Sequence, residues 1–247
     1  PQYVQSFGYV GFHALAVVDD GAIMENGTPD VHDYIHDLPH FADQDDSQIA
    51  GIVMNANPFT NGHRYLVEQA SKANDHVYVF VVSQEASLFT AAERYQLVQA
   101  GCADLDNVTV VPGGDYMVSY ATFPAYFLKD DQNVAHFQAA LDATLFKEQI
   151  AAPLNITRRY VGSEPFSPTT DIYNQELTRV LPPEVEVKIL DRAANASQDV
   201  ISATKVRAAI ANDELAVVQD YVPQTTLSFI QNHWSDLRAR IKEGSLE

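Results

Sequence analysis

From Ile49 onward, short apolar runs alternate with stretches in which apolar residues recur at helical spacing. The apolar runs cover 49–56, 76–83, 107–113, 157–163 and 185–191, and the helical patterns cover 62–73, 90–101, 133–150 and 171–181. Strands that are apolar on both faces are typical of a parallel sheet with helices on both sides. The pattern therefore predicts an α/β fold with a doubly wound, five-stranded parallel sheet. Such sheets bind ligands at the carboxyl ends of their strands, near the point where the strand order reverses.

The first 48 residues follow a different pattern. Apolar runs at 13–18 and 22–26 flank a short polar turn and predict a hairpin, and a helix is expected over 28–38 with Thr28 as its N-cap and Pro29 at its first position. The polar, acidic stretch 41–48 predicts a linker. Two strands and one helix are too little to form a core alone. Residues 1–48 are therefore either a stub packed on the main domain, residues 49–247 with its C-terminal helices, or the tail of a domain that is missing here.

Charge and composition limit the kinds of partner that the protein can bind. The 33 acidic and 15 basic residues give a formal net charge of −18, which argues against non-specific attraction to nucleic acid or to an anionic membrane. The single cysteine, Cys102, excludes an internal disulfide and a cysteine-based metal site. This fits the reducing environment of the cytoplasm, where we expect the protein. No apolar run approaches the ~20 residues of a membrane span, and no signal-peptide pattern opens the chain. The start at Pro1 and the ending GSLE suggest a trimmed chain with a vector-derived tail.

The segment NPFTNGHRYL joins the first predicted strand to the first predicted helix. Asn57 begins a turn, and either Thr60 or Asn61 caps a helix that starts near Gly62. The free N–H groups of a helix N-terminus attract phosphate, and a glycine lets a nucleotide approach the backbone closely. His63 on the first turn can donate a hydrogen bond to an α- or β-phosphate oxygen. The alternative is a capped turn that carries a surface histidine.

A second segment, DVISATKVRAAI, follows the fifth predicted strand and starts a helix at or near Ser202. The hydroxyls of Ser202 and Thr204, the guanidinium of Arg207 and the mobile cation of Lys205 would form a triphosphate clamp together with the backbone N–H groups. An ordinary serine-capped helix with solvated cations is the alternative. That alternative explains one segment, but not why two such segments flank the sheet.

Four segments resemble a known family: GIVMNANPFTNGHRYLVEQA, GGDYMVSYATFPAYFLK, RYVGSEPFSPTTDIYNQEL and ISATKVR. TNGH resembles the T/H-x-G-H motif of nucleotidyltransferases, and ISATKVR resembles their I-S-S/T-x-x-R motif. In this order, over about residues 49–226, the four segments resemble the citrate (pro-3S)-lyase ligases. The resemblance implies a Rossmann-like fold of the HUP nucleotidyltransferase type.

The resemblance also implies a reaction. In that family acetate attacks the α-phosphorus of ATP, pyrophosphate leaves, and the acetyl group passes from acetyl-adenylate to the prosthetic-group thiol of the citrate lyase acyl-carrier subunit. ATP and Mg²⁺ are thus the implied cofactors, and acetate and the carrier subunit the implied partners. Catalysis would consist of positioning and charge stabilisation.

The positions that match the motifs imply which residues of this chain have the family's roles. Thr60, Gly62 and His63 would hold the α- and β-phosphates, and Ser202, Thr204 and Arg207 the β- and γ-phosphates. Thr60, His63 and Arg207 would be catalytic, and Asn57 and Lys205 would also touch the nucleotide. The chain departs from the motifs at Thr60, which stands in place of a histidine, and at Ala203, which stands in place of a frequent hydroxyl residue. The family also carries an N-terminal acetyltransferase-like domain, of which residues 1–48 would be only the end.

Two further groups lie after predicted strands. Gly162, Ser163 and Glu164 would touch adenine or ribose, or would form a simple strand-to-helix turn. The segment after the third strand offers acetate or pantetheine contacts, although its aromatic residues fit a core equally well. These candidates are Asp115, Tyr116, Ser119 and Thr122.

Three other patterns favour structural roles. His32, His36 and His40 recur every four residues, but Pro39 is expected to end that helix before a metal site can form. Arg94 either reaches the site or, more simply, forms a surface ion pair with Glu93 or a neighbour. Cys102 has no basic neighbour in the sequence to activate it and is expected to be structural.

Two other functions remain as alternatives. Another adenylyltransferase, such as a pantetheine-phosphate adenylyltransferase, would need a second basic cluster for its phosphorylated acceptor. A non-catalytic protein-binding module would have no reason to keep His63 and Arg207.

Overall fold

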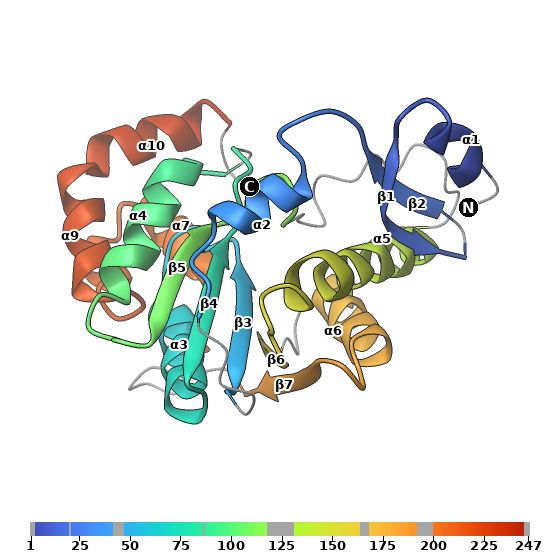
Figure 1. Ribbon diagram of the computed structural model, residues 1–247. Coiled ribbons are helices and arrows are strands. Elements are labelled where there is room, and N and C mark those ends of the chain that lie inside the picture. Colours follow the sequence, from blue (N-terminus) through green and yellow to red (C-terminus); the bar gives the residue numbers. More distant parts are fainter. Residues whose placement is uncertain are drawn as a thin grey trace.

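The protein is built on one five-stranded parallel sheet, shown with its helices in the computed structural model of Figure 1. The structure describes residues 3–19, 21–41, 47–85, 87–117, 131–163, 168–191 and 200–244. The strand order of the sheet is β5-β4-β3-β6-β7, and every neighbouring pair of strands is parallel. The predicted doubly wound fold is therefore confirmed. The strands are β3 (Ile49–Met54), β4 (His76–Val81), β5 (Val108–Pro112), β6 (Arg158–Gly162) and β7 (Glu186–Leu190).

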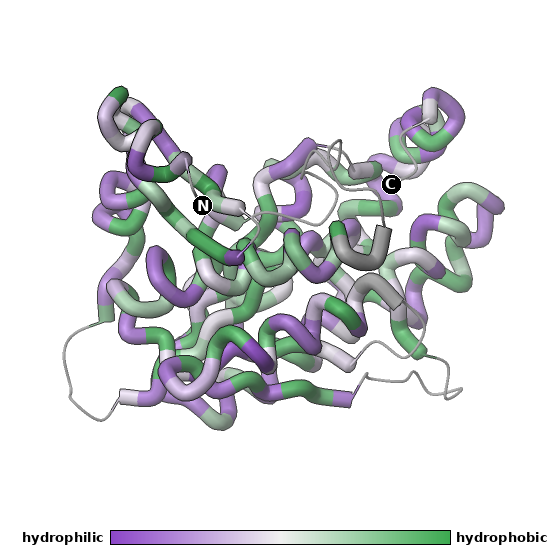
Figure 2. Tube along the Cα trace, turned by 90° about the vertical axis from the view of Figure 1, so that its right-hand side faces the viewer, coloured by the Kyte–Doolittle hydropathy of each residue, from purple (hydrophilic) through white to green (hydrophobic). Residues whose placement is uncertain are grey.

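Helices pack on both faces because the central strands are apolar on both. Along β4, Val77 and Val79 belong to one core cluster, while Tyr78 and Phe80 belong to the other. Figure 2 shows hydrophobic stretches running through the interior, with hydrophilic residues along the outer helices. Among the described residues, no helix combines the length and apolar character needed to span a membrane.

One face carries α3 (Asn61–Ala73) and α4 (Ala91–Gly101), together with the C-terminal helices α7 (Ala203–Ala211), α8 (Leu215–Val218), α9 (Gln224–Asn232) and α10 (Trp234–Lys242). The other face carries α5 (Asp131–Leu145), its π-helical continuation η2 (Phe146–Ala151) and α6 (Pro168–Val180). The helix predicted over 133–150 thus ends in a π-helical turn. There the ring of Phe146 packs over Gly51, where a Cβ atom would approach it to 3.0 Å.

Strands β3 and β6 separate toward their carboxyl ends. Their ladder pairs only Ala50 with Arg158 and Gly51 with Arg159, whereas β3 and β4 pair all the way to Met54 and Val81. The strand order reverses between β3 and β6, since β4 and β5 lie on one side and β7 on the other. The separation is therefore at the switch point, where doubly wound sheets bind their ligands.

The N-terminal segment packs on the main sheet. It consists of α1 (Val4–Gly8), the hairpin β1 (His13–Val18) and β2 (Gly21–Glu25), and α2 (Val31–Asp37). Leu15, Val31 and Ile35 are buried in the same core cluster as Tyr78 and Leu141. The predicted hairpin and helix are present, and most of the predicted linker lies outside the described residues.

The predicted N-cap of this helix was wrong. Helix α2 is capped by Asp30 instead of Thr28, because the Asp30 carboxylate accepts the N–H groups of His32 and Asp33 at 2.8 and 3.0 Å. Asp33 completes a capping box by accepting the Asp30 N–H at 3.0 Å. Aspartate is a strong N-cap, and a box of this kind fixes the helix start two residues after Pro29.

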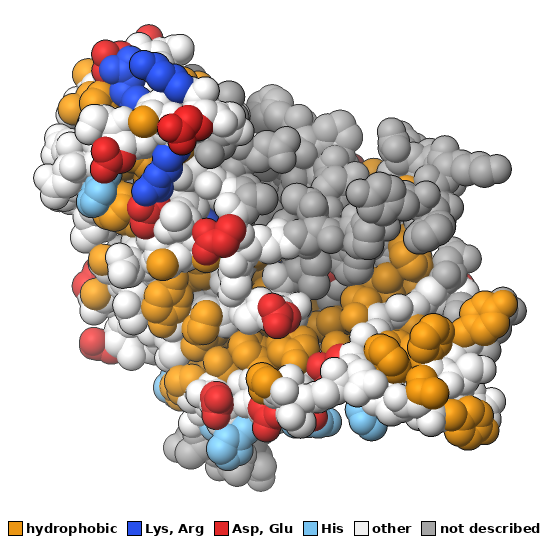
Figure 3. Space-filling view, turned by 90° about the horizontal axis from the view of Figure 1, so that it is seen from above, with side chains coloured by type: hydrophobic (Ala, Val, Ile, Leu, Met, Phe, Trp, Pro, Cys, Tyr) orange, Lys and Arg blue, Asp and Glu red, His pale blue; other side chains and the backbone are white. Residues whose placement is uncertain are grey.

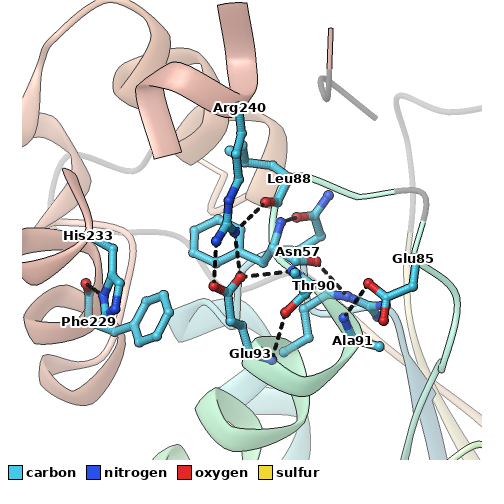
Figure 4. A network of polar contacts seen from close by, with 11 residues as sticks. Asn57, Glu85, Leu88, Thr90, Ala91, Glu93, Phe229, His233 and Arg240 are labelled. Atoms are coloured by element: carbon cyan, nitrogen blue, oxygen red, sulfur yellow. Dashed lines mark hydrogen bonds and ion pairs between the residues drawn. The ribbon is translucent and has the colours of Figure 1, made fainter. Parts of the chain in front are cut away.

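Glu93 ties the C-terminal helices to α4, as Figure 4 shows. Its carboxylate accepts two hydrogen bonds from Arg240 at 2.7 and 2.8 Å and a third from the Thr90 N–H at 2.9 Å. Arg240 also reaches the Leu88 carbonyl oxygen at 3.2 Å. Burial alone would raise the pKa of Glu93, but the hydrogen bonds from Arg240 and Thr90 outweigh it and hold that pKa below its usual range.

We expect Glu93→Ala to lower the free energy of unfolding by about 2 kcal/mol at pH 7, since it removes both a capping-box partner and a charge-assisted pair. The folded pKa of Glu93 is lowered, so the unfolded chain binds more protons in acid. This stabilisation is therefore lost as the pH falls below about 4.3, the usual glutamate pKa, and on through the lowered pKa of the folded state. Urea unfolding of both proteins at several pH values measures the difference. Glu93→Gln is the control, because glutamine keeps the capping box without the charge. A difference between wild type and Glu93→Ala that stays constant from pH 7 to pH 3.5 would contradict this account.

Candidate active site

Helix α3 begins with a complete capping box. Thr60 is the N-cap, and its hydroxyl oxygen accepts the N–H of His63 at 3.4 Å. In return the Thr60 N–H donates to Nδ1 of His63 at 3.0 Å, and the Thr60 hydroxyl oxygen lies 2.9 Å from the same nitrogen. Of the two predicted caps, Thr60 is correct, and Asn61 is the first helical residue.

These contacts select the tautomer of His63. Because Nδ1 accepts the Thr60 N–H, it carries no proton in the neutral ring, and the ring proton lies on Nε2. An imidazole held this way donates through Nε2, as contact with a phosphate oxygen requires. The buried ring of Phe59 stacks near the imidazole, with the centroids 5.8 Å apart and the planes at 15°.

Helix α7 starts in contact with α3. Ser202 caps α7 by accepting the Lys205 N–H at 3.3 Å, as predicted. A Cβ atom on Gly62 would lie 3.5 Å from the Ile201 carbonyl oxygen, so the residue before the cap of α7 touches the first turn of α3. The N-termini of the two helices therefore lie side by side.

Arg207 joins the two motif segments directly. Its Nη1 donates to the Asn57 carbonyl oxygen at 2.8 Å, across 150 residues of sequence, and its Nη2 donates to the Thr204 hydroxyl at 3.4 Å. The side chain is half-buried, and burial lowers the pKa of Arg207. The structure thus brings together Asn57, Thr60, Gly62, His63, Ser202, Thr204 and Arg207.

Lys205 is exposed at this end of α7. Its ammonium lies 5.6 Å from the centre of the Tyr221 ring, a cation–π distance. The Tyr221 carbonyl oxygen accepts the Asn61 N–H at 2.9 Å. Tyr221, which the sequence did not single out, therefore contacts both helices.

The Asn57 side chain is buried, with 3% of its surface exposed. Its Oδ1 accepts the N–H of Phe89 at 3.1 Å and so ties the turn after β3 to the segment before α4 (Figure 4). The predicted nucleotide contact of Asn57 remains a prediction. In the structure its side chain holds one loop and its carbonyl group holds Arg207.

The end of β6 faces the same edge of the sheet. A Cβ atom on Gly162 would meet nothing within 4 Å, so the space beside this residue is open. The Gly162 carbonyl oxygen accepts a hydrogen bond from Asn174 at 3.2 Å, and the Ser163 N–H donates to the Leu190 carbonyl oxygen at 2.7 Å. Glu164 lies outside the described residues.

The segment after β5 is held by the N-terminal segment. Asp115 is exposed, whereas the Tyr116 hydroxyl donates to a carboxylate oxygen of Glu25 at 3.0 Å. The ring of Tyr34 lies 5.1 Å from that of Tyr116, and its hydroxyl donates to the Pro112 carbonyl oxygen at 2.8 Å. The other two predicted contacts, Ser119 and Thr122, lie outside the described residues.

Arg94 was misjudged from the sequence. It is fully buried, so the expected surface ion pair is absent, and its guanidinium donates to the carbonyl oxygens of Asn55 and Val82 at 2.8 and 2.7 Å. A signal was available, because Arg94 shares one helical stripe with the buried residues Leu97, Val98 and Gly101. An arginine on an apolar stripe needs internal acceptors.

Cys102 is buried near the guanidinium of Arg64, a neighbour that the sequence did not reveal. Burial raises the pKa of the Cys102 thiol to about 12, despite the lowering effect of the nearby Arg64. We expect Cys102 to resist alkylation by iodoacetamide at pH 8 in the folded protein and to react after unfolding in urea. Mass spectrometry of both samples measures this. Equal labelling of the two would show that the thiol is accessible.

The three regularly spaced histidines His32, His36 and His40 do not lie on one continuous helix. Helix α2 ends at Asp37, and the His40 ring contacts the Ile35 carbonyl oxygen at 3.0 Å. Within the part of the chain that the structure describes, no group of three His, Cys, Asp or Glu side chains could hold a metal ion.

Figure 3 shows the molecule from above, where the carboxyl end of β3 points in Figure 1. Hydrophobic side chains run across the middle of this face, and acidic side chains are scattered over it. The visible Lys and Arg side chains gather on the left, the side of α9 and α10 in Figure 1.

Comparison with known proteins identifies the family. Residues 49–230 match the model of the citrate lyase ligase C-terminal domain. The chain belongs to the citrate lyase ligase family. It is 37% identical over 238 residues to the citrate (pro-3S)-lyase ligase of Haemophilus influenzae, covering 94% of this chain and 70% of that protein. It is 40% identical over 230 residues to the ligase of that name from Klebsiella pneumoniae, covering 91% and 67%.

The family assignment confirms the resemblance found in the four sequence segments. Among solved structures, a bifunctional NMN adenylyltransferase/ADP ribose pyrophosphatase from Francisella tularensis aligns with a TM-score of 0.48 and 17% identity, over 80% of this chain and 54% of that one.

Proposed function

We propose that this citrate lyase ligase family member is an AMP-forming enzyme that activates acetate with ATP. An oxygen of acetate attacks the α-phosphorus, the bond to the β-phosphate bridge breaks, and pyrophosphate leaves. The prosthetic-group thiol of the citrate lyase acyl-carrier subunit then attacks the acetyl carbonyl carbon, and AMP leaves. The names of the relatives support a ligase that acts on citrate lyase, and the acetyl-adenylate steps extend that support.

The observation that carries the proposal is the junction of the two motif segments. Two helix N-termini meet beside the place where β3 and β6 separate, with Arg207 bridging them through the Asn57 carbonyl group. Two adjoining helix N-termini, the guanidinium of Arg207 and a histidine that donates through Nε2 suit a triphosphate.

Each residue has a proposed task. The first turn of α3 and Nε2 of His63 bind the α- and β-phosphates and stabilise the charge that grows as pyrophosphate departs. Ser202, Thr204, Lys205 and Arg207 hold the β- and γ-phosphates, so that the leaving group stays in line with acetate. None of these residues needs to form a covalent bond.

Gly162, Ser163 and Glu164 are proposed to contact adenine or ribose at the end of β6. The segment that includes Asp115, Tyr116, Ser119 and Thr122 is proposed to face acetate or the pantetheine arm. Mg²⁺ is proposed to enter with ATP on the phosphate oxygens, as it does in many nucleotide sites.

The decisive experiment incubates the protein with ATP, Mg²⁺ and a candidate acceptor and measures pyrophosphate. Acetate-dependent release supports the proposal, and added carrier subunit should convert the product to acetyl-carrier and AMP. Release only with a phosphopantetheine compound would assign a different adenylyltransferase. Absence of ATP binding in calorimetry would indicate a protein-binding module with the same fold.

A further inference from the structure

Arg94 is a buried cation whose hydrogen-bond acceptors, in the described part of the chain, are all neutral. It has 0% of its surface exposed, and among the described residues its hydrogen-bond acceptors are four backbone carbonyl groups and one side-chain amide. Burial lowers the pKa of Arg94, and the nearby carboxylate of Glu85 partly opposes that effect. Because leaving a buried charge without partners is costly, the acceptors and the guanidinium hold one another in place.

The acceptors come from three segments that meet at the carboxyl edge of the sheet. Nη1 donates to Asn55 through its carbonyl oxygen at 2.8 Å and its side-chain oxygen at 2.7 Å, and to the Val82 carbonyl oxygen at 2.7 Å. Nη2 donates to the Gln84 carbonyl oxygen, and Nε donates to that of Phe89 at 3.1 Å. One planar group therefore connects the ends of β3 and β4 to the segment before α4.

These carbonyl groups lie beyond the reach of the sheet. The ladder between β3 and β4 ends at Met54 and Val81, and one more hydrogen bond runs from the Val82 N–H to the Met54 carbonyl oxygen at 3.1 Å. Beyond this point the carbonyl groups of the buried residues Val82 and Phe89 need another donor. Arg94 supplies it, because its donors form a rigid fork that a lysine ammonium cannot reproduce.

The turn that follows leads directly into the phosphate motif. Asn55 precedes Ala56, whose φ of 50° is in the left-handed region, a conformation that is strained for a non-glycine residue. Next comes Asn57, which accepts the Phe89 N–H and the Arg207 guanidinium. Arg94 and Asn57 thus make two separate links between this turn and the Phe89 segment.

We propose that Arg94 is a positioning residue of the nucleotide site, which holds the turn after β3 so that His63 and Arg207 face the same phosphates. The proposal rests on the proposed function for its kinetic consequence. The restraint on the turn itself does not depend on that function.

The test replaces Arg94 with lysine and measures hydrogen exchange at the amides of 55–63, followed by kcat and KM for ATP. Exchange there should rise at least tenfold, and kcat/KM for ATP should fall at least tenfold, because the lysine leaves carbonyl groups unpaired. If Arg94→Lys does not fold, Asn55→Ala removes one acceptor without burying an unpaired charge, and it should raise exchange at the same amides by a smaller factor.

Arg159→Lys is the matched control. Arg159 is also buried, with 2% of its surface exposed, and its guanidinium lies 4.2 Å from the centre of the Phe146 ring on the other face of the sheet. Its replacement should lower stability but leave exchange at 55–63 within twofold of wild type.

Two results would overturn the inference. One is a folded Arg94→Lys protein whose exchange at 55–63 and whose kcat/KM for ATP stay within twofold of wild type. The other is an equal rise in exchange at 55–63 in Arg159→Lys, which would make the effect a general loss of stability. If wild type fails to bind ATP while Arg94→Lys still raises exchange at 55–63 alone, the proposed function fails and only the restraint of Arg94 on the turn after β3 stands.

Discussion

Replacing His63 with alanine is expected to slow acetate-dependent pyrophosphate release roughly 10²- to 10³-fold, the usual loss when one donor to a developing charge is removed. The reason is the geometry of its ring. Nδ1 accepts the Thr60 N–H at 3.0 Å, so the proton lies on Nε2, the atom proposed to face the phosphates. The loss should appear in kcat more than in KM for ATP, because the contact strengthens as charge builds on the leaving pyrophosphate.

His63 also supports the helix, so the measurement needs a control that separates the two roles. Alanine removes the capping-box partner of Thr60 and should lower the free energy of unfolding by about 1 kcal/mol. Glutamine at the same position can accept the Thr60 N–H, as glutamine commonly does in a capping box. His63→Gln should therefore recover most of the stability while its rate stays well below wild type. A His63→Ala protein with the full rate would remove His63 from the mechanism.

The parts of this site that could be predicted from the sequence are local. The caps Thr60 and Ser202 follow from residues at most three positions away, and each is present in the structure. The doubly wound parallel sheet could be predicted because buried strands joined by helices allow few arrangements. The meeting of the two motifs follows in turn, since both begin helices at the carboxyl edge.

The parts that could not be predicted depend on partners far apart in the sequence. Arg94 meets Asn55 from 39 residues away, and Tyr116 meets Glu25 from 91 residues away. A general rule that places arginine at the surface failed because the strand ends needed a donor at the position of Arg94. The sequence offered Tyr116 either as a substrate contact or as part of the core, and its link to Glu25 could not be foreseen; the substrate contact stays a prediction.

Replacing Arg207 with alanine is expected to lower kcat/KM for ATP roughly 10-fold to 150-fold. A charge-assisted contact to phosphate contributes about 1.5 to 3 kcal/mol, and each 1.4 kcal/mol is a factor of ten. The variant also loses the hydrogen bond to the Asn57 carbonyl oxygen at 2.8 Å, the direct link between the two motifs. Steady-state kinetics and calorimetry with ATP measure both effects. Arg238→Ala is the matched control, because Arg238 forms an ion pair with Asp213 at 2.7 Å and should leave both quantities within twofold.

Arg207→Lys distinguishes charge from geometry. Lysine keeps one positive charge in α7, but it cannot bind the Asn57 carbonyl oxygen, the Thr204 hydroxyl and a phosphate in one plane, as a guanidinium can. If the planar guanidinium is required, the kcat/KM of Arg207→Lys should be closer to that of Arg207→Ala than to that of wild type. The loss in ATP affinity should be smaller than the loss in rate. A lysine variant with wild-type kinetics would mean that Arg207 acts as a simple cation. Unchanged kinetics in Arg207→Ala would exclude Arg207 from the triphosphate site altogether, and the contact between α3 and α7 would then be only structural.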